Sequence, residues 1–139
     1  MQRSILYLDD ESRQLEIFHE MFHPEYDVRT ALTAAAARRL LKQRPAGIVI
    51  SDQRLTETNG TEFLRAVAKA HPASYRILLT GVARVGDVLP ELGAGIIHAF
   101  ITKPWTEQEM RQVLERASAS LEIPHTLRRL SRGKRNDRP

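Results

Sequence analysis

The sequence predicts an α/β fold in which helices cover both faces of a parallel sheet. Short and nearly continuous apolar runs recur along the chain, and amphipathic stretches with apolar residues three or four positions apart lie between them. Continuous apolar runs are typical of strands that are buried on both faces. A chain of 139 residues with 42% hydrophobic content is long enough for one ordinary core. We therefore expect one doubly wound domain.

Five strands are expected along the chain. Four are strong apolar runs, and the second strand in order is weaker. The expected ranges are 4–8, 26–30, 47–51, 76–80 and 96–101. Strands that alternate with helices imply right-handed crossovers and hence parallel neighbours in one sheet.

A helix is expected after each strand. Apolar residues at helical spacing, or an Ala-rich run, indicate helices around 15–22, 34–42, 63–68 and 110–121. Thr33 is a suitable N-cap for the second of these helices. The fourth helix of the series falls in 81–95, where four glycines and Pro90 should weaken it. We expect this region and the surface around it to be mobile or shortened.

The positive charge of the chain is concentrated at its C-terminal end. Of the net charge of +4, residues 125–139 contribute six basic side chains against one acid, which leaves a net charge of −1 for the rest. We therefore expect one globular domain over 1–123 and a flexible basic tail or linker over 124–139. The tail could instead be a patch for nucleic acid or an acidic partner, but it has no aromatic residues to interleave with bases. We expect no direct nucleic-acid binding by this domain.

The composition also excludes several classes of protein. There are no cysteines, so neither disulfides nor thiolate metal sites can contribute. No apolar stretch approaches the roughly 20 residues that span a bilayer. The five histidines show no spacing typical of metal ligands. We expect a cytoplasmic protein without a membrane segment.

Polar residues stand at the ends of four of the expected strands. Asp9 and Asp10 follow the first strand, Asp52 the third, Thr80 the fourth and Lys103 the fifth. In doubly wound sheets, ligands bind beyond the carboxyl ends of the strands, near the point where the strand order reverses. We expect these five side chains to converge on one edge of the sheet.

Taken singly, these residues have ordinary structural explanations. Asp9 and Asp10 could be helix N-caps, Asp52 a turn residue, and Lys103 a solvated lysine before a proline. Together they indicate chemistry, because two carboxylates about 4 Å apart repel by on the order of 4 kcal/mol at an effective dielectric constant near 20.

A cation would offset this repulsion. Mg²⁺ suits an oxygen-rich site, and Lys103 supplies a second positive charge. Asp52 could then act as a nucleophile toward a phosphoryl group, and the Thr80 hydroxyl could bind the transferred phosphate.

The chain resembles response-regulator receiver domains, which have a CheY-like, flavodoxin-like fold. The resemblance covers about residues 3–121 and rests on Leu-Asp-Asp-Glu at 8–11, Ser-Asp-Gln-Arg-Leu at 51–55, Gly60, Leu-Leu-Thr-Gly at 78–81, and Phe-Ile-Thr-Lys-Pro-Trp at 100–105. It implies a five-stranded parallel sheet of order 2-1-3-4-5. It also implies that Asp52 accepts a phosphoryl group from a sensor histidine kinase, with Mg²⁺ as the cofactor.

The resemblance implies a set of metal ligands. Asp10 and Asp52 would bind Mg²⁺ directly, together with the backbone carbonyl of Arg54, and Asp9 would act through water. Thr56 departs from the family pattern, because proline usually stands at this position. This difference puts the usual geometry of the loop after Asp52 in question.

The resemblance also implies a conformational switch. Thr80 and Phe100 would form a coupled pair, in which the hydroxyl turns to the phosphate and the ring swings inward. The peptide bond between Lys103 and Pro104 would be cis. The face formed by the fourth helix, the fifth strand and the fifth helix would carry the output, and it is also a plausible homodimer surface.

The residues after the fourth and fifth strands resemble those of receivers in NtrC-type transcriptional activators, including hydrogenase-gene regulators, and in cyclic-dinucleotide phosphodiesterases. We therefore expect a signalling module whose own catalysis is limited to self-phosphorylation and autodephosphorylation. DNA binding would come from a separate output domain or partner. Two alternatives stay open: a phosphorylation-independent interaction domain, and an aspartyl-phosphate hydrolase. Arg54 argues against the hydrolase, because such enzymes usually have an Asp-x-Asp pair.

Overall fold

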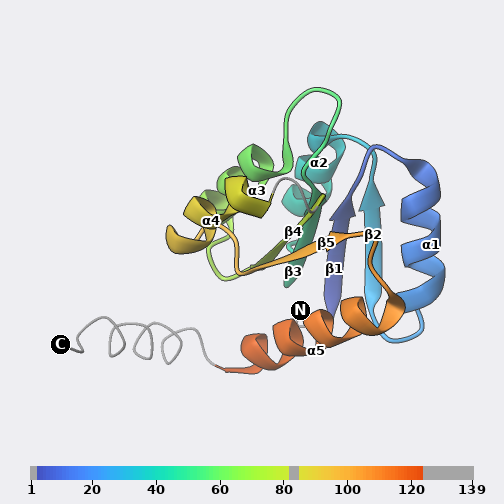
Figure 1. The fold of residues 1–139 in the computed structure, drawn as a ribbon. Coiled ribbons are helices and arrows are strands. Elements are labelled where there is room, and N and C mark those ends of the chain that lie inside the picture. The colour runs from blue at the N-terminus through green and yellow to red at the C-terminus, as the bar shows by residue number, and fades with distance from the viewer. Residues whose placement is uncertain (1–2, 82–84, 124–139) are drawn as a thin grey trace.

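The chain forms a five-stranded, entirely parallel sheet of order β2-β1-β3-β4-β5 (Figure 1). A computed structural model describes residues 3–81 and 85–123, so the expected tail at 124–139 lies outside the described residues. The strands are β1 (Ser4–Leu8), β2 (Asp27–Ala31), β3 (Ile48–Asp52), β4 (Tyr75–Gly81) and β5 (Ala99–Lys103). The predicted strand order is confirmed.

Helices cover both faces of the sheet. They are α1 (Ser12–Phe22), α2 (Ala34–Gln43), α3 (Gly60–Ala70), α4 (Val85–Gly93) and α5 (Glu107–Glu122). Figure 1 shows α1 and α5 on one face and α2, α3 and α4 on the other. In the described part of the chain, no helix combines the length and the apolar character that a membrane crossing would need.

Side-chain caps fix where three of the helices begin. Thr33 accepts a hydrogen bond from the backbone N–H of Ala36, as expected at the start of α2. Asn59 caps α3 in the same way, and Thr106 forms a reciprocal capping box with Glu109 at the start of α5. Each cap satisfies backbone donors that the first helical turn would otherwise leave unpaired.

The sheet separates two apolar cores. The core under α1 and α5 contains an aromatic group of Tyr7, Phe18 and Phe22, all fully buried. The core under α2, α3 and α4 is mainly aliphatic, with Phe63 as its largest side chain. Burying a side chain of this size stabilises a fold by roughly 1.5–3 kcal/mol. The two cores together hold the strand ends in fixed register.

The last strand begins later than its apolar run predicted. The backbone N–H groups of Ile96 and Ile97 both donate to the carbonyl oxygen of Glu91, which ties this segment to the end of α4. The strand therefore starts at Ala99. The fourth helix does form, with nine described residues and Pro90 inside it, and it is the shortest of the helices in the described ranges. Its expected mobility stays a prediction.

Candidate functional site

Three carboxylates meet at the carboxyl edge of the sheet. Asp9 and Asp10 follow β1, Asp52 ends β3, and one oxygen from each lies within 4.8 Å of the others. The two strands are neighbours in register, with Leu8 opposite Ser51, so residues at their ends must be close. Asp9 and Asp52 are buried and Asp10 is exposed. The structure thus places these three predicted site residues together.

Lys103 reaches the same place from the end of β5. Its Nζ atom lies 3.2 Å from Oδ2 of Asp52, and the Asp52 side chain is only 5% exposed. The peptide bond between Lys103 and Pro104 is cis. The pocket therefore contains three carboxylates and one ammonium group, which leaves an excess of negative charge.

The electrostatics of Asp52 reflect this imbalance. Burial raises the pKa of the Asp52 carboxyl above its usual value, and this effect outweighs the opposing effect of the Lys103 ammonium. The negative charge of Asp9 raises the pKa further, whereas a hydrogen bond from the backbone of Arg54 lowers it. The single lysine does not fully offset burial and the neighbouring acids, so a further cation would stabilise the ionised pocket.

The other two carboxylates accept hydrogen bonds that the sequence did not lead us to expect. The hydroxyl of Tyr7 donates to Oδ2 of Asp9 over 2.7 Å, and the Thr56 hydroxyl lies 3.3 Å from Oδ2 of Asp10. The sequence does contain a signal for the contact between Tyr7 and Asp9. A tyrosine inside an apolar strand, two residues before an aspartate, shares its face of the sheet. Thr56, which stands where proline is usual in the family, thus places a hydroxyl beside Asp10.

A close backbone contact holds the loop after Asp52. A Cβ atom added to Gly60 would lie 2.4 Å from the carbonyl oxygen of Asp52 and 2.7 Å from a methyl carbon of Leu78, so only glycine fits without a shift. The Gln53 side chain accepts hydrogen bonds from both the backbone N–H and the hydroxyl of Thr61. The start of α3 is therefore docked directly on the end of β3.

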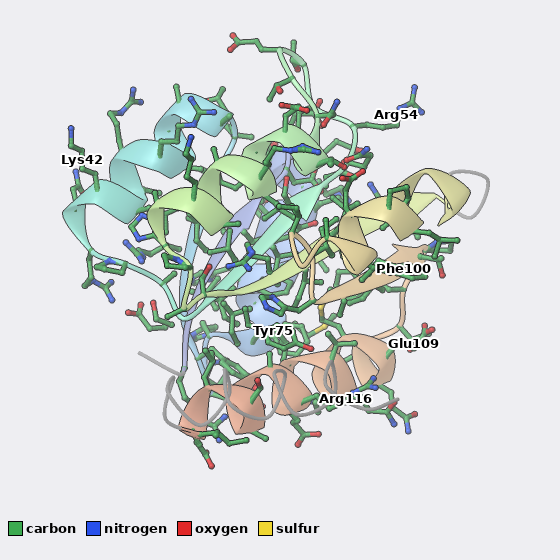
Figure 2. All side chains as sticks on the ribbon, turned by 90° about the vertical axis from the view of Figure 1, so that its left-hand side faces the viewer. Lys42, Arg54, Tyr75, Phe100, Glu109 and Arg116 are labelled. Atoms are coloured by element: carbon green, nitrogen blue, oxygen red, sulfur yellow. The ribbon has the colours of Figure 1, made fainter. Side chains whose placement is uncertain are left out.

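Arg54 lies in this loop with its side chain exposed and directed away from the body of the molecule (Figure 2). Its backbone forms an isolated antiparallel bridge with Asn59, the N-cap of α3. The loop backbone is thereby held near Asp52, while the guanidinium group projects outward. Any role for Arg54 in ligand binding would therefore involve its backbone.

Thr80 and Phe100 lie on neighbouring strands. Thr80 is 1% exposed, and its hydroxyl makes a long contact of 3.4 Å to the carbonyl oxygen of Gly81. Phe100 is half-buried on β5 and packs against the core under α4 (Figure 2). The strand register pairs Leu78 with Phe100 and Thr80 with Thr102, so Thr80 and Phe100 share one face of the sheet.

The residues present fit a hard divalent cation. Three carboxylate groups converge, two of them buried, and their charge exceeds that of the nearby lysine. Carboxylate and carbonyl oxygens are the ligands that Mg²⁺ prefers, usually with several waters retained. The exposed position of Asp10 leaves room for such waters.

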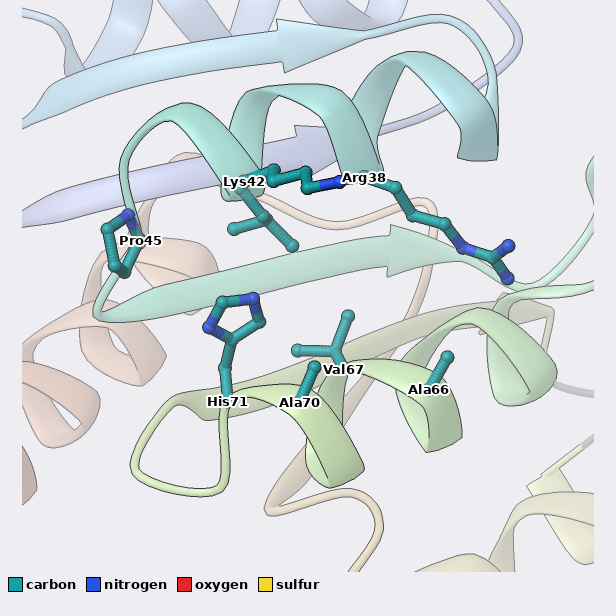
Figure 3. Close-up of a pocket in the computed structure, with 8 residues that line it drawn as sticks. Arg38, Lys42, Pro45, Ala66, Val67, Ala70 and His71 are labelled. Carbon is teal, nitrogen blue, oxygen red and sulfur yellow. The ribbon is translucent and has the colours of Figure 1, made fainter.

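A separate groove lies between α2 and α3. Its volume is about 600 Å³, and its lining is apolar with basic side chains at the rim (Figure 3). Arg38, Leu41, Lys42, Pro45, Ala66, Val67, Ala70 and His71 line it. None of these described lining residues is a carboxylate, and most come from the later turns of both helices, toward the amino edge of the strands. The groove is therefore distinct from the acidic pocket.

Comparisons with known proteins agree on the class of domain. A model of the response regulator receiver domain matches residues 5–115. Over 138 residues the chain is 28% identical to the hydrogenase transcriptional regulatory protein HoxA of Cupriavidus necator. The match covers 99% of this chain but 29% of HoxA, so the chain spans less than a third of that relative.

Two solved structures have closely similar folds. The signal receiver domain of an HD domain-containing protein from Pseudomonas fluorescens superposes with a TM-score of 0.79 at 28% identity, covering 88% of this chain and 91% of that one. A structure described as an adenylate cyclase from Rhodopirellula baltica gives a TM-score of 0.87, covering 95% and 98% of the two chains. At 19% identity, the second likeness concerns the fold alone.

Proposed function

Because the chain belongs to the response regulator receiver domain family, we propose that it accepts a phosphoryl group from a sensor histidine kinase on Asp52. One observation carries the proposal: a buried carboxylate at the end of β3 lies 3.2 Å from the Lys103 ammonium and beside two further acids. This arrangement combines a nucleophile with fixed positive charge and a cation-binding group, as phosphoryl transfer requires.

In the proposed reaction, a carboxylate oxygen of Asp52 attacks the phosphorus atom of a phosphohistidine. The new O–P bond forms as the N–P bond to the histidine ring breaks, and the ring nitrogen keeps the bonding electron pair. The Lys103 ammonium stabilises the negative charge on the phosphoryl oxygens in the transition state of the transfer. Burial of Asp52 keeps bulk water away from the acyl phosphate that results.

Asp10, Asp52 and the backbone carbonyl of Arg54 would hold Mg²⁺ directly, with Asp9 acting through water. When bound, Mg²⁺ would neutralise charge on the phosphoryl oxygens and on the clustered carboxylates. The Thr56 hydroxyl, 3.3 Å from Asp10, would help to hold that carboxylate at the mouth of the pocket.

We infer that phosphorylation changes the surface formed by α4, β5 and α5. The buried hydroxyl of Thr80 makes only a long contact to the carbonyl oxygen of Gly81. Losing this contact would cost little free energy, so the hydroxyl can turn toward a phosphate. Phe100 is half-buried on the same face of the sheet and would move inward as Thr80 turns. The same surface could then bind an output domain or a second copy of this chain.

The output is proposed to be transcriptional. The match covers 29% of HoxA, which is a transcriptional regulatory protein. The remaining part of such a protein would supply any contact with DNA. This role would place the protein in the cytoplasm. The domain itself would act as a switch, with catalysis limited to its own phosphorylation and dephosphorylation.

Intact mass spectrometry tests the proposal. The chain and its Asp52→Asn variant are incubated with Mg²⁺ and a small acyl or amido phosphate donor, with EDTA as the metal-free control. We expect the chain to gain one phosphoryl group, about 80 Da, only when Mg²⁺ and Asp52 are both present. Phosphorylation of the variant to the same extent would contradict the role of Asp52.

Other outcomes would favour the alternatives. If the chain gains no phosphoryl group, the phosphorylation-independent interaction domain becomes the better explanation. Multiple turnover on phosphate esters would instead favour the aspartyl-phosphate hydrolase. The arginine two residues after Asp52 argues against that enzyme, because such enzymes usually have an Asp-x-Asp pair, and the Arg54 side chain points outward (Figure 2).

A further inference from the structure

A buried tyrosine contacts the acidic pocket from inside the core. Tyr7 lies on β1 with no exposed surface, and its hydroxyl donates to Oδ2 of Asp9 over 2.7 Å. Its ring is buried in the core under α1 and α5, but its hydroxyl contacts Asp9, one of the three clustered carboxylates. A phenol carries its proton at neutral pH, so this group acts as a hydrogen-bond donor to Asp9.

Aromatic packing restrains the phenol ring of Tyr7. The Tyr7 ring lies 4.8 Å from the ring of Phe18, measured between centroids, and Phe18 lies 4.9 Å from Phe22 and 6.4 Å from Trp105. Close packing of this kind restricts the rotamers open to the ring, so the position of its hydroxyl is well defined. The position of Oδ2 of Asp9 is therefore set by the core.

Asp9 is held at both of its oxygens. Oδ2 accepts from Tyr7, and Oδ1 accepts from the backbone N–H of Glu11 over 3.0 Å. Asp9 has no exposed surface, yet it stands within 4.8 Å of oxygens of Asp10 and Asp52. Without a donor at Oδ2, repulsion from the other two carboxylates would favour rotation of Asp9 away from the pocket.

We propose that Tyr7 is a positioning residue for the cation site, which holds Asp9 in the orientation that Mg²⁺ binding needs. This inference rests on the proposed function. A neutral donor leaves the full charge of Asp9 in place while it fixes the direction of the carboxylate. Hydrogen-bond partners of direct metal ligands commonly change metal affinity by 10-fold to 100-fold, and because Asp9 would act through water, the lower end of this range applies to Tyr7. The role is one of binding, so the chemical step at Asp52 does not depend on it.

The test compares Tyr7→Phe with the unchanged chain. Mg²⁺ is titrated while the fluorescence of Trp105, the only tryptophan in the sequence, reports binding, with two-dimensional NMR as a second readout. We expect Tyr7→Phe to weaken Mg²⁺ binding by about 10-fold. With the small phosphate donor, the Mg²⁺ concentration for half-maximal rate should rise equally, and the rate at saturating Mg²⁺ should stay near its original value.

Two further variants isolate the hydrogen bond. Tyr26→Phe removes the hydroxyl of another buried tyrosine in the same core, so it should leave the Mg²⁺ affinity unchanged. Asp9→Ala removes the acceptor, and on that background Tyr7→Phe should have no further effect on the affinity. If Tyr7→Phe fails to fold, the comparison of Asp9→Ala with the unchanged chain still tests whether Asp9 contributes to Mg²⁺ binding.

The outcomes are distinct. Equal Mg²⁺ affinities for Tyr7→Phe and the unchanged chain would overturn the role of Tyr7 and leave the proposed function intact. The role of Tyr7 would also be overturned if Tyr7→Phe lowered the Mg²⁺ affinity equally with Asp9 present and with Asp9→Ala. An unchanged Mg²⁺ affinity in Asp9→Ala itself would overturn it too. Absence of Mg²⁺ binding by the unchanged chain would instead count against the proposed function, on which this inference depends.

Discussion

The two edges of the sheet bury charge in opposite ways. At the amino edge, Arg76 on β4 is 4% exposed, and its guanidinium donates to backbone oxygens of Ile96, Ser74 and Gly95 over 2.8–3.2 Å, and to the Ser74 hydroxyl. At the carboxyl edge, three carboxylates share one ammonium group. The first charge is surrounded by acceptors, whereas the second site has an excess of one sign.

This difference distinguishes a charge that the fold satisfies from a charge that the fold leaves uncompensated. The carbonyl groups around Arg76 belong to the loops before β4 and β5, so the arginine holds these two loops together. The three carboxylates outnumber the one ammonium group beside them, so a further cation would lower the free energy of the ionised pocket. Burial alone therefore does not make a charged residue a candidate for a functional site, whereas an uncompensated buried charge does.

The largest expected effect of a substitution on stability is at Arg76. Arg76→Met should lower the free energy of unfolding by about 3 kcal/mol, because it leaves several buried carbonyl oxygens without a donor. Urea denaturation measures the change. Arg44→Met is the matched control: Arg44 is exposed and paired with Asp27, so its loss should cost at most about 1 kcal/mol. Equal losses in the two variants would contradict the structural role of Arg76.

A smaller effect is expected at Gly60, next to the acidic pocket. In Gly60→Ala the added methyl group would overlap the backbone of Asp52, and such overpacking typically costs about 1–3 kcal/mol. The displacement of Asp52 should also slow phosphorylation by the small donor. In Gly86→Ala the new methyl group meets no atom within 4 Å, so this variant should keep both stability and rate. Unchanged phosphorylation in Gly60→Ala would show that the pocket tolerates a shift of β3.

The smallest expected effect is the pH dependence of stability without metal. Burial raises the pKa of Asp52 above its value in the unfolded chain, so between these two pKa values the folded protein binds more protons. Stability should therefore fall as pH rises through this window, and the loss should persist at neutral pH.

Asp52→Asn removes this titration. The variant should be more stable than the unchanged chain at neutral pH in EDTA, by about 1 kcal/mol, and the difference should shrink in acid. Urea denaturation across the pH range measures both curves. Asp27→Asn, at an exposed and paired carboxylate, should bring no such gain. Parallel curves for Asp52→Asn and the unchanged chain would contradict an excess of negative charge in the pocket.

Local features of the sequence predicted most of the architecture. Apolar runs and helical spacing are properties of a few consecutive residues, so they indicated five strands and five helices in the order now seen. The edges of elements were less accurate, as at β5, because the backbone of Ile96 and Ile97 bonds to α4 and not to a strand. The apolar character of Ile96 and Ile97 does not reveal whether their backbone pairs with a strand or with the end of a helix.

Only part of the pocket could be predicted from the sequence. The residues at the strand ends, Asp9, Asp10, Asp52 and Lys103, were identified because parallel strands bring their carboxyl ends to one edge. The contact between Tyr7 and Asp9, the fit of Gly60 against Asp52, and the carbonyl shell of Arg76 were decided by the tertiary structure. They depend on strand register and on side-chain packing across elements distant in the chain, and distances of a few ångströms between such elements exist only once the cores have formed.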